Sequence, residues 1–206
     1  MSIRIKRVFA ALNYWRMFPV YLCVLCSKQK HLIKMDIARW NDINQLHLSF
    51  FESLNWYMTY KKEFSNLLQH RLKNPSRTIG AFFHYTLARV LWKPLETLYI
   101  NTTEIGGGLY LQHAFSTIIS AQKIGENCRI YQQVTIGYKG DASPILEDNV
   151  SVACGAKVLG DVTMHAHSLA AAGAVVVKDV PEKAIVGGVP AKVIGYKEDD
   201  NLDFQG

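Results

Sequence analysis

His113 is the residue whose type and setting most clearly offer chemistry. It stands near the end of the stretch Gly106–Phe115, which reads Gly-Gly-Gly-Leu-Tyr-Leu-Gln-His-Ala-Phe. A neutral imidazole can accept the proton of a hydroxyl while that hydroxyl attacks a carbonyl carbon. His113 is therefore a candidate general base, and the alternative is a histidine that is merely exposed on the surface.

The other histidines and the cysteines are weaker candidates. We interpret His165 and His167 as surface residues. Cys23 and Cys26 form a C-x-x-C pair, but no second pair accompanies them and a structural zinc site needs about four ligands. We expect no metal. Because the cysteine pattern indicates no disulfide framework, we expect a cytoplasmic protein.

A period of six residues begins at about Leu98, where charge density falls and Gly, Ala, Val and Ile dominate. Neither a strand period of two nor a helical period produces such spacing. It predicts a triangular coil with one short strand on each side, and about four such coils of a parallel β-helix over residues 105–180. We expect Tyr138–Pro144 to bulge from one coil as a loop. The repeat positions are Ile105, Leu111, Thr117, Ile124, Ile130, Ile136, Leu146, Val152, Val158, Met164, Ala170 and Val176.

Residues 1–97 show helical spacing of apolar side chains, and we expect a helical N-terminal domain that serves oligomerisation. The segment Val8–Cys26 is the most apolar, but Asn13, Arg16 and Pro19 interrupt it, so it does not read as a membrane span. We expect Pro19 to break this helix in two.

Positive charge gathers at the start of the chain. Such a cluster suits an acidic surface such as lipid, nucleic acid or a phosphorylated carrier, or it forms a solvated helix face. We expect peripheral contact with the inner face of the membrane through residues 1–30, and no nucleic acid. Against Asp36 alone, residues 1–40 hold Arg4, Lys6, Arg7, Arg16, Lys28, Lys30, Lys34 and Arg39.

Several motifs of the repeat region resemble those of the hexapeptide-repeat acyltransferases, and more narrowly the serine acetyltransferase group. The resemblance implies an α+β protein in which the helical domain precedes a left-handed parallel β-helix. It also implies acetyl-CoA as the donor and active sites between neighbouring coils of a homotrimer or higher homo-oligomer. The motifs lie at residues 105–114, 132–137, 155–162, 172–181 and 188–195.

The same resemblance assigns roles to particular residues. His113 matches the catalytic histidine of the family. Small residues along the coils match the places where a pantetheine arm bonds to the backbone, and two lysines match those that meet the CoA phosphates. The donor-site residues implied in this way are Gly137, Gly155, Ala171, Ala172, Gly173, Lys178 and Lys192.

The acceptor site departs from the serine enzymes. Leu98 stands where those enzymes have an aspartate that orients the histidine, so Glu96 is the nearest acid that could replace it. Gln112 replaces a second acid, and Ala142 and Ser143 replace an Arg-His pair. A zwitterionic amino acid needs a cation and an anion, whereas a sugar hydroxyl needs neutral hydrogen-bonding groups. The acceptor-binding candidates are Gln112, Asp141, Ser143, Asp36 and Asp42.

The sequence therefore predicts an acetyl-CoA-dependent O-acetyltransferase that acts on a sugar of a surface polysaccharide or of its lipid-linked precursor. Serine O-acetylation in cysteine biosynthesis is one alternative, and a catalytically weak β-helix scaffold is another. We expect the helical domain over residues 1–97 and the β-helix over residues 98–195. Residues 196–206 form a tail that resembles the remnant of a protease site.

Overall fold

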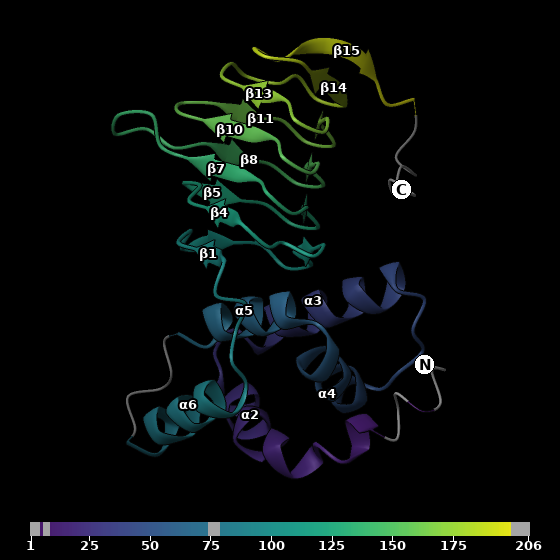
Figure 1. Cartoon of the computed structure of the whole chain (residues 1–206), viewed down its shortest axis with the longest axis vertical. Coiled ribbons are helices and arrows are strands. Elements are labelled where there is room, and N and C mark those ends of the chain that lie inside the picture. Colours follow the sequence, from purple (N-terminus) through teal and green to yellow (C-terminus); the bar gives the residue numbers. More distant parts are fainter. Residues whose placement is uncertain (1–4, 6–8, 74–78, 199–206) are drawn as a thin grey trace. The chain divides into compact units, whose positions relative to one another are not determined.

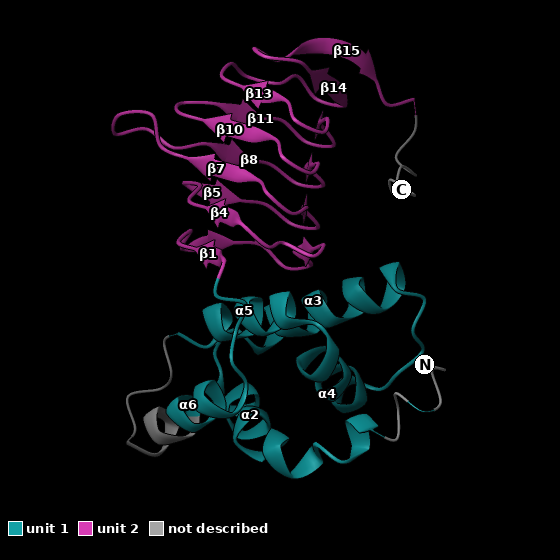
Figure 2. Cartoon of the chain, in the orientation of Figure 1, with its two compact units in different colours: residues 1–96 teal, residues 97–206 magenta. Residues whose placement is uncertain are grey.

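The computed structural model describes residue 5, residues 9–73 and residues 79–198. Its chain divides into two compact units, Met1–Glu96 and Thr97–Gly206 (Figure 2). The boundary predicted from the sequence, after residue 97, is one residue later. The tail expected from residue 196 begins later as well, because Tyr196 belongs to a strand and the Lys197 N–H donates to Lys183. Residues 199–206 lie outside the described part.

The first unit is helical. Its core holds Trp40, Tyr57 and Phe64, whose rings pack against one another with centroids 5.1–5.3 Å apart. Glu52 accepts a hydrogen bond from the Ser49 N–H at 2.9 Å, which satisfies a donor at the start of helix α4 (Phe50–Tyr60). The labelled helices are α2 (Tyr14–Cys26), α3 (Lys30–Ile43), α4 (Phe50–Tyr60), α5 (Lys62–Arg71) and α6 (Ile79–Leu91) (Figure 1).

Helix α2 runs through Pro19 without a break, so the expectation that this proline divides it is wrong. A proline removes one hydrogen bond to the preceding turn. Packing offsets that loss here, because Met17, Pro19, Val20 and Val24 are all buried. The Arg16 guanidinium also donates to the Leu91 carbonyl, which ties α2 to the end of α6.

The second unit is a parallel β-helix, as predicted (Figure 1). It has about five turns rather than the four expected, because pairing already begins at Leu98. In its later part the repeat is eighteen residues long, as in the pairing of Lys157 with Val175. Its strands form three sheets, one on each side of the coil, which we call A, B and C.

Sheet A lines one side of the coil. Its inward ladder runs through Ile119, Ile136, Val158 and Val176, all of which are buried. Thr117, assigned to this ladder from the sequence, lies two residues before Ile119 and takes an adjacent buried position. The strands are β1 (Leu98–Ile100), β4 (Thr117–Ile119), β7 (Thr135–Gly137), β10 (Lys157–Leu159) and β13 (Val175–Val176).

Sheet B forms the second side. Its inward ladder is Ile105, Ile124, Leu146 and Met164, as the sixfold period predicts. The loop Tyr138–Pro144 leaves the coil between sheets A and B and folds into a tight turn, in which the Lys139 N–H donates to the Ala142 carbonyl. The strands are β2 (Glu104–Ile105), β5 (Lys123–Ile124), β8 (Ile145–Leu146) and β11 (Thr163–Met164).

Sheet C forms the third side. Its parallel ladder ends where a final strand, β15, pairs antiparallel with β14. This strand covers one edge of the sheet, an edge that would otherwise offer unpaired backbone groups. The strands are β3 (Tyr110–Leu111), β6 (Arg129–Ile130), β9 (Ser151–Val152), β12 (Leu169–Ala170), β14 (Ala184–Gly187) and β15 (Lys192–Tyr196).

Candidate active site

His113 lies where the chain turns from sheet C into sheet A. We call the stack of such turns, residues 112–116, 131–134, 153–156 and 171–174, the C–A corner. Counted between residues that pair on neighbouring coils, the first turn is two residues longer than the next. Seven positions separate Leu111 from Ile118, whereas five separate their partners Ile130 and Thr135. Along the sequence, this coil is only one residue longer than a regular coil, because its next corner, from sheet A to sheet B, is one residue shorter.

The longer turn is also the most strained. His113, Ala114 and Ser116 all have positive φ, at 62°, 44° and 52°. A non-glycine residue in this region costs about 1–3 kcal/mol and persists only where its surroundings enforce it. The three later turns of the C–A corner each contain one residue of positive φ, namely Gln133, Gly155 and Gly173. Strain is thus concentrated at the predicted catalytic residue.

The His113 ring is exposed, whereas Ala114 beside it is fully buried and anchors the turn. Within the described part of the chain, no hydrogen bond orients the His113 imidazole. Leu98 cannot do so, because its side chain is apolar and only 5% exposed. Glu96, the proposed replacement, is exposed and is the last residue of the helical unit.

The C–A corner brings several of the predicted donor-site residues onto one edge of the coil with His113. Gly155, Ala172 and Gly173 lie there on later turns, with Ala171 beside them. No other atom lies within 4 Å of a Cβ built on Gly173, and the atoms nearest to one on Gly155 are 3.9 Å away. Positive φ favours glycine at these two places, and the lack of a side chain leaves an open surface.

Backbone donors line this surface. The N–H groups of Gly155 and Gly173 are used within the coil, on the carbonyls of Gln132 and Cys154. Those of Cys154 and Ala172 make no hydrogen bond to any described residue. A ligand that carries amide carbonyls could accept from them.

Three predicted donor-site residues lie elsewhere. Gly137 ends β7, and Lys178 follows β13, so both lie where the chain leaves sheet A. Lys192 starts β15, and both lysines are exposed. The predicted donor-site residues therefore lie partly on the C–A corner and partly on other edges of the coil.

Gln132 is a residue that the site prediction missed. It lies on the C–A corner, one turn after His113, and its side-chain carbonyl oxygen is buried without a hydrogen-bond partner. An unpaired buried acceptor costs about 1–3 kcal/mol, so such a group in a native protein calls for a partner. Gln132 is part of the motif at residues 132–137, but nothing in that motif distinguishes it from the other residues of the repeat.

The acceptor-binding candidates of the β-helix do not gather around His113 in one chain. Gln112 precedes His113 and is half-buried. Asp141, which is exposed, and Ser143, which is buried, belong to the loop between sheets A and B. That loop and His113 therefore lie on different corners of the coil.

Asp36 and Asp42, the two acceptor-binding candidates of the helical unit, differ in how exposed their carboxylates are. Asp36 forms a bidentate ion pair with Arg71, with N–O distances of 3.0 and 3.1 Å, and both side chains are 2% exposed. Its carboxylate is therefore occupied and out of reach of an acceptor, and the structure does not support its assignment to the substrate site. Asp42 is largely exposed, and Arg39 lies 3.7 Å away.

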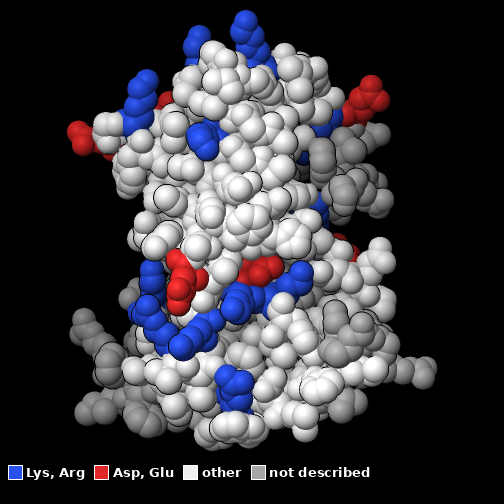
Figure 3. Space-filling view, viewed as in Figure 1, with Lys and Arg blue, Asp and Glu red and all other residues white. Residues whose placement is uncertain are grey.

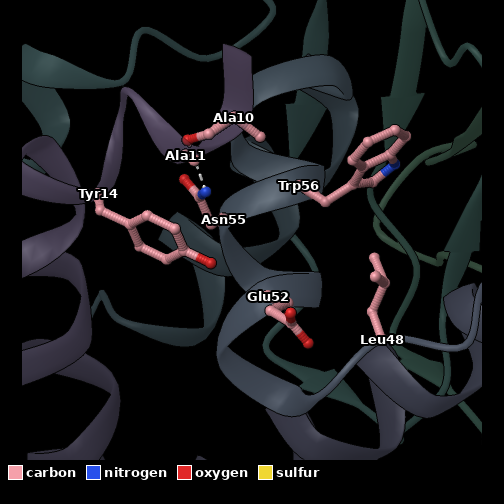
Figure 4. Close-up of a pocket in the computed structure, with 7 residues that line it drawn as sticks. All are labelled: Ala10, Ala11, Tyr14, Leu48, Glu52, Asn55 and Trp56. Atoms are coloured by element: carbon pink, nitrogen blue, oxygen red, sulfur yellow. Dashed lines mark hydrogen bonds between the residues drawn. The ribbon is translucent and has the colours of Figure 1, made fainter. Parts of the chain in front are cut away.

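The helical unit contains a pocket of its own, shown in Figure 4. The Asn55 amide donates to the Ala10 carbonyl at 2.8 Å, and its own oxygen has no partner. None of the predicted site residues lines this pocket, so we assign it no part in the chemistry. Its lining consists of Ala10, Ala11, Tyr14, Leu48, Glu52, Asn55 and Trp56.

The remaining reactive side chains have structural surroundings. The His165 ring lies 3.2 Å from the Glu147 carboxylate, on the surface of the coil. Burial raises the pKa of the Cys128 thiol to about 12 and that of Cys23 to about 11, so neither is a ready nucleophile. No group of three or more His, Cys, Asp or Glu side chains among the described residues is arranged to hold a metal ion.

Comparison with known proteins identifies the family. No family model matches the chain. The serine acetyltransferase of Staphylococcus xylosus is 31% identical over 173 residues, which cover 79% of this chain and 76% of that protein. The chain belongs to the serine acetyltransferase family. Members of this family are acyltransferases, so the predicted enzyme class is confirmed.

Other members of the serine acetyltransferase family match over different lengths. That of Synechococcus elongatus is 40% identical over 104 residues, which span 48% of this chain but only 42% of the relative. A crystal structure of the serine acetyltransferase from Brucella abortus is similar with a TM-score of 0.61 and 28% identity, covering 82% of this chain and 69% of that one. A second structure of the Brucella enzyme, in complex with coenzyme A, has a TM-score of 0.60 at 25% identity and covers 86% of this chain and 72% of that one.

Proposed function

We propose that this protein transfers an acetyl group from acetyl-CoA to a hydroxyl, with His113 as the general base. The acceptor oxygen attacks the thioester carbonyl carbon while the imidazole takes its proton. The carbon–sulfur bond then breaks, and the CoA sulfur recovers a proton from the imidazolium. The observation that carries the proposal is the strained, two-residue-longer turn that holds an exposed His113.

Acetyl-CoA fits the C–A corner. Its pantetheine arm contains two amide groups, and the free N–H groups of Cys154 and Ala172 lie along the same edge as His113. Gly155 and Gly173 leave that edge open. The exposed lysines Lys178 and Lys192 remain our candidates for the CoA phosphates, since phosphates attract cations at the surface.

For the acceptor we propose a sugar hydroxyl of a surface polysaccharide or its lipid-linked precursor. Gln112 and Ser143 offer neutral hydrogen-bonding groups. Asp36, an acid that could have paired with an ammonium group, is already paired with Arg71. The competing acceptor is L-serine, which the names of the relatives favour.

We propose a homotrimer or a higher homo-oligomer as the active form. Asp141 and Ser143 project from a different corner of the coil than His113, so one chain does not present them to the same substrate. In a cyclic oligomer, the corner of one subunit can face the loop of the next. A complete site would then form between subunits.

The cellular place that we propose is the cytoplasm, with peripheral contact at the inner face of the membrane through residues 1–30. No helix among the described residues is long and apolar enough to cross a membrane. Arg4, Lys6 and Arg7, which contribute to this expectation, lie outside the described residues.

The experiment is a thiol-release assay with acetyl-CoA on the native chain and on two variants, His113→Asn and His167→Asn. Both histidines have φ of 62° on corners of the coil, and asparagine tolerates this conformation. We expect His113→Asn to lose about 10²–10⁴-fold in kcat, which is the usual contribution of a general base, and His167→Asn to keep full activity. Equal activity in the two variants would refute the role of His113.

The acceptor is tested in the same assay with L-serine and with undecaprenyl-linked or free hexoses. Turnover with serine at rates above those with any sugar would overturn the glycan assignment and leave the donor chemistry standing. No turnover with either, together with unchanged acetyl-CoA hydrolysis in His113→Asn, would favour a scaffold without catalysis.

A further inference from the structure

Helix α2 is apolar on two faces. One face is buried and carries Met17, Val20 and Val24. On another face Trp15 is 72% exposed and Leu25 is 47% exposed, and Phe18 between them is 61% exposed. A helix that is apolar all round is normally enclosed, so the outer face of α2 is unusual for a helix in water.

Exposed apolar side chains also occur before α2. Leu12, in the turn that precedes the helix, is 65% exposed, and Phe9 is 53% exposed. We call the side of the helix that carries Trp15 and Leu25 the outer face of α2. Large apolar side chains exposed in this way favour a partner that removes them from water, since each buried CH₂ group gains about 0.8 kcal/mol.

The chain segment that carries this face is basic. The first 35 residues contain no Asp or Glu, although they contain seven Lys or Arg. Lys28, just after α2, and Lys34 in α3 are exposed. Figure 3 shows Lys and Arg gathered in a band over the helical unit, with Asp and Glu beside them. The Arg16 guanidinium does not add to this exposed charge, because it donates to the Leu91 carbonyl and lies 4.5 Å from the centre of the Trp92 ring.

These properties together describe a helix that lies in a lipid interface. Interfacial helices combine an apolar face that includes aromatic residues with Lys and Arg, and they lie in the plane of the membrane rather than across it. Tryptophan is enriched at the level of the lipid headgroups. No helix among residues 9–73 and 79–198 qualifies as a membrane span, so α2 could only lie along such a surface.

We infer that the outer face of α2 docks the protein on an anionic lipid bilayer. Trp15 and Leu25 would enter the boundary between headgroups and acyl chains, and the exposed Lys28 and Lys34 would attract acidic headgroups. This inference goes beyond acetyl transfer and does not depend on it. It also assigns a particular helix face to the membrane contact expected from the sequence.

The test is co-sedimentation of the full chain with vesicles. One set contains phosphatidylcholine alone, and the other contains about one third phosphatidylglycerol, which supplies the negative surface potential. We expect binding to the anionic vesicles at low ionic strength, and weaker binding as salt is added. Because Trp40 and Trp92 are buried and Trp15 is exposed, the tryptophan fluorescence should shift to shorter wavelength on binding.

Two double variants give the matched comparison. Trp15→Ser with Leu25→Ser removes apolar surface from α2, and Tyr99→Ser with Tyr196→Ser removes exposed aromatic rings from the β-helix unit. We expect the α2 variant to bind anionic vesicles about tenfold or more weakly, and the control to bind as the native chain does. The native chain's failure to bind anionic vesicles would overturn the inference, as would equal binding by the two variants.

The second copy of the chain is the rival occupant of this face. Light scattering after gel filtration, without lipid, measures the oligomeric state of the native chain and of the Trp15→Ser, Leu25→Ser variant. The docking inference requires the same state for both. A smaller assembly in the α2 variant would identify the face as an interface between copies and would overturn the inference. Acetyl transfer to a soluble acceptor, measured in parallel, reports separately on the proposed function.

Discussion

At the scale of the residue, the site depends on where strain and unpaired groups fall. His113, Ala114 and Ser116 form the only turn of the C–A corner, within the described residues, in which three residues have positive φ. Such strain is kept where function requires a particular side-chain position. It presents the His113 imidazole outward without a hydrogen bond to hold it, so a ligand or a neighbouring subunit must orient it.

Gln132 offers a residue-scale prediction. Its buried carbonyl oxygen lacks a partner on the same corner, so we expect a bound substrate to donate to it. Gln132→Met keeps the length of the side chain and removes the amide. We expect the KM for acetyl-CoA or for the acceptor to rise about tenfold, the loss of one hydrogen bond, with Tm unchanged or higher.

Steady-state kinetics and a thermal melt check this prediction together. A purely structural role for Gln132 would lower Tm and leave both KM values unchanged, contrary to our expectation. The control is Gln133→Asn, because Gln133 is exposed on the same turn and asparagine suits its φ of 59°.

At the scale of the element, the coil depends on how closely its corners stack. Gly106 and Gly125 occupy successive turns between sheets B and C. A Cβ on Gly106 would lie 2.6 Å from the carbonyl carbon of Gly125, which is backbone and cannot move aside easily. The glycine of the opening motif is thus required by packing between coils, independently of any catalytic role.

We therefore predict that Gly106→Ala destabilises the β-helix by about 1–3 kcal/mol, the usual cost of overpacking. Gly195→Ala is the control, because no atom lies within 4 Å of its Cβ and its effect should be within about 0.5 kcal/mol. Denaturant unfolding of both variants measures the difference. Equal stability would mean that the coils can separate locally, and the packing account would then fail.

At the scale of the whole molecule, one chain does not bring all of the predicted acceptor-binding residues together with His113. His113 and the loop Tyr138–Pro144 lie on different corners of the coil. If the active enzyme is a closed oligomer, each site combines the corner of one subunit with the loop of another.

Mixed oligomers test this arrangement. His113→Asn abolishes the base, and a variant with both Asp141→Ala and Ser143→Ala removes polar groups of the loop. Each should be weakly active alone. After the two are unfolded together and refolded, some sites would combine an intact histidine with an intact loop, so we expect activity well above the sum of the separate preparations. No gain in the mixture would indicate that each site is built within one subunit.

The sequence by itself predicted the β-helix, which the structure confirms, and it singled out His113 as a candidate general base, which stays a prediction. A sixfold repeat of aliphatic residues admits few other folds, because each coil must bury the same positions in the same order. The helical region was equally predictable, since Leu54, Tyr57, Phe64 and Leu67 follow the helical period and are buried. Local spacing is sufficient for both.

Only the tertiary structure decided which residues share an edge and which are already engaged. Asp36 was a candidate ligand until its pairing with Arg71, thirty-five residues away, occupied the carboxylate. Thr117 fits the sixfold count, yet pairing between coils places Ile119 in the ladder, because two extra residues at the His113 turn shift the register. The unpaired oxygen of Gln132 and the exposed outer face of α2 likewise depend on what the rest of the chain covers. Contacts between distant residues set burial and pairing, and the order of residues along the chain does not specify them locally.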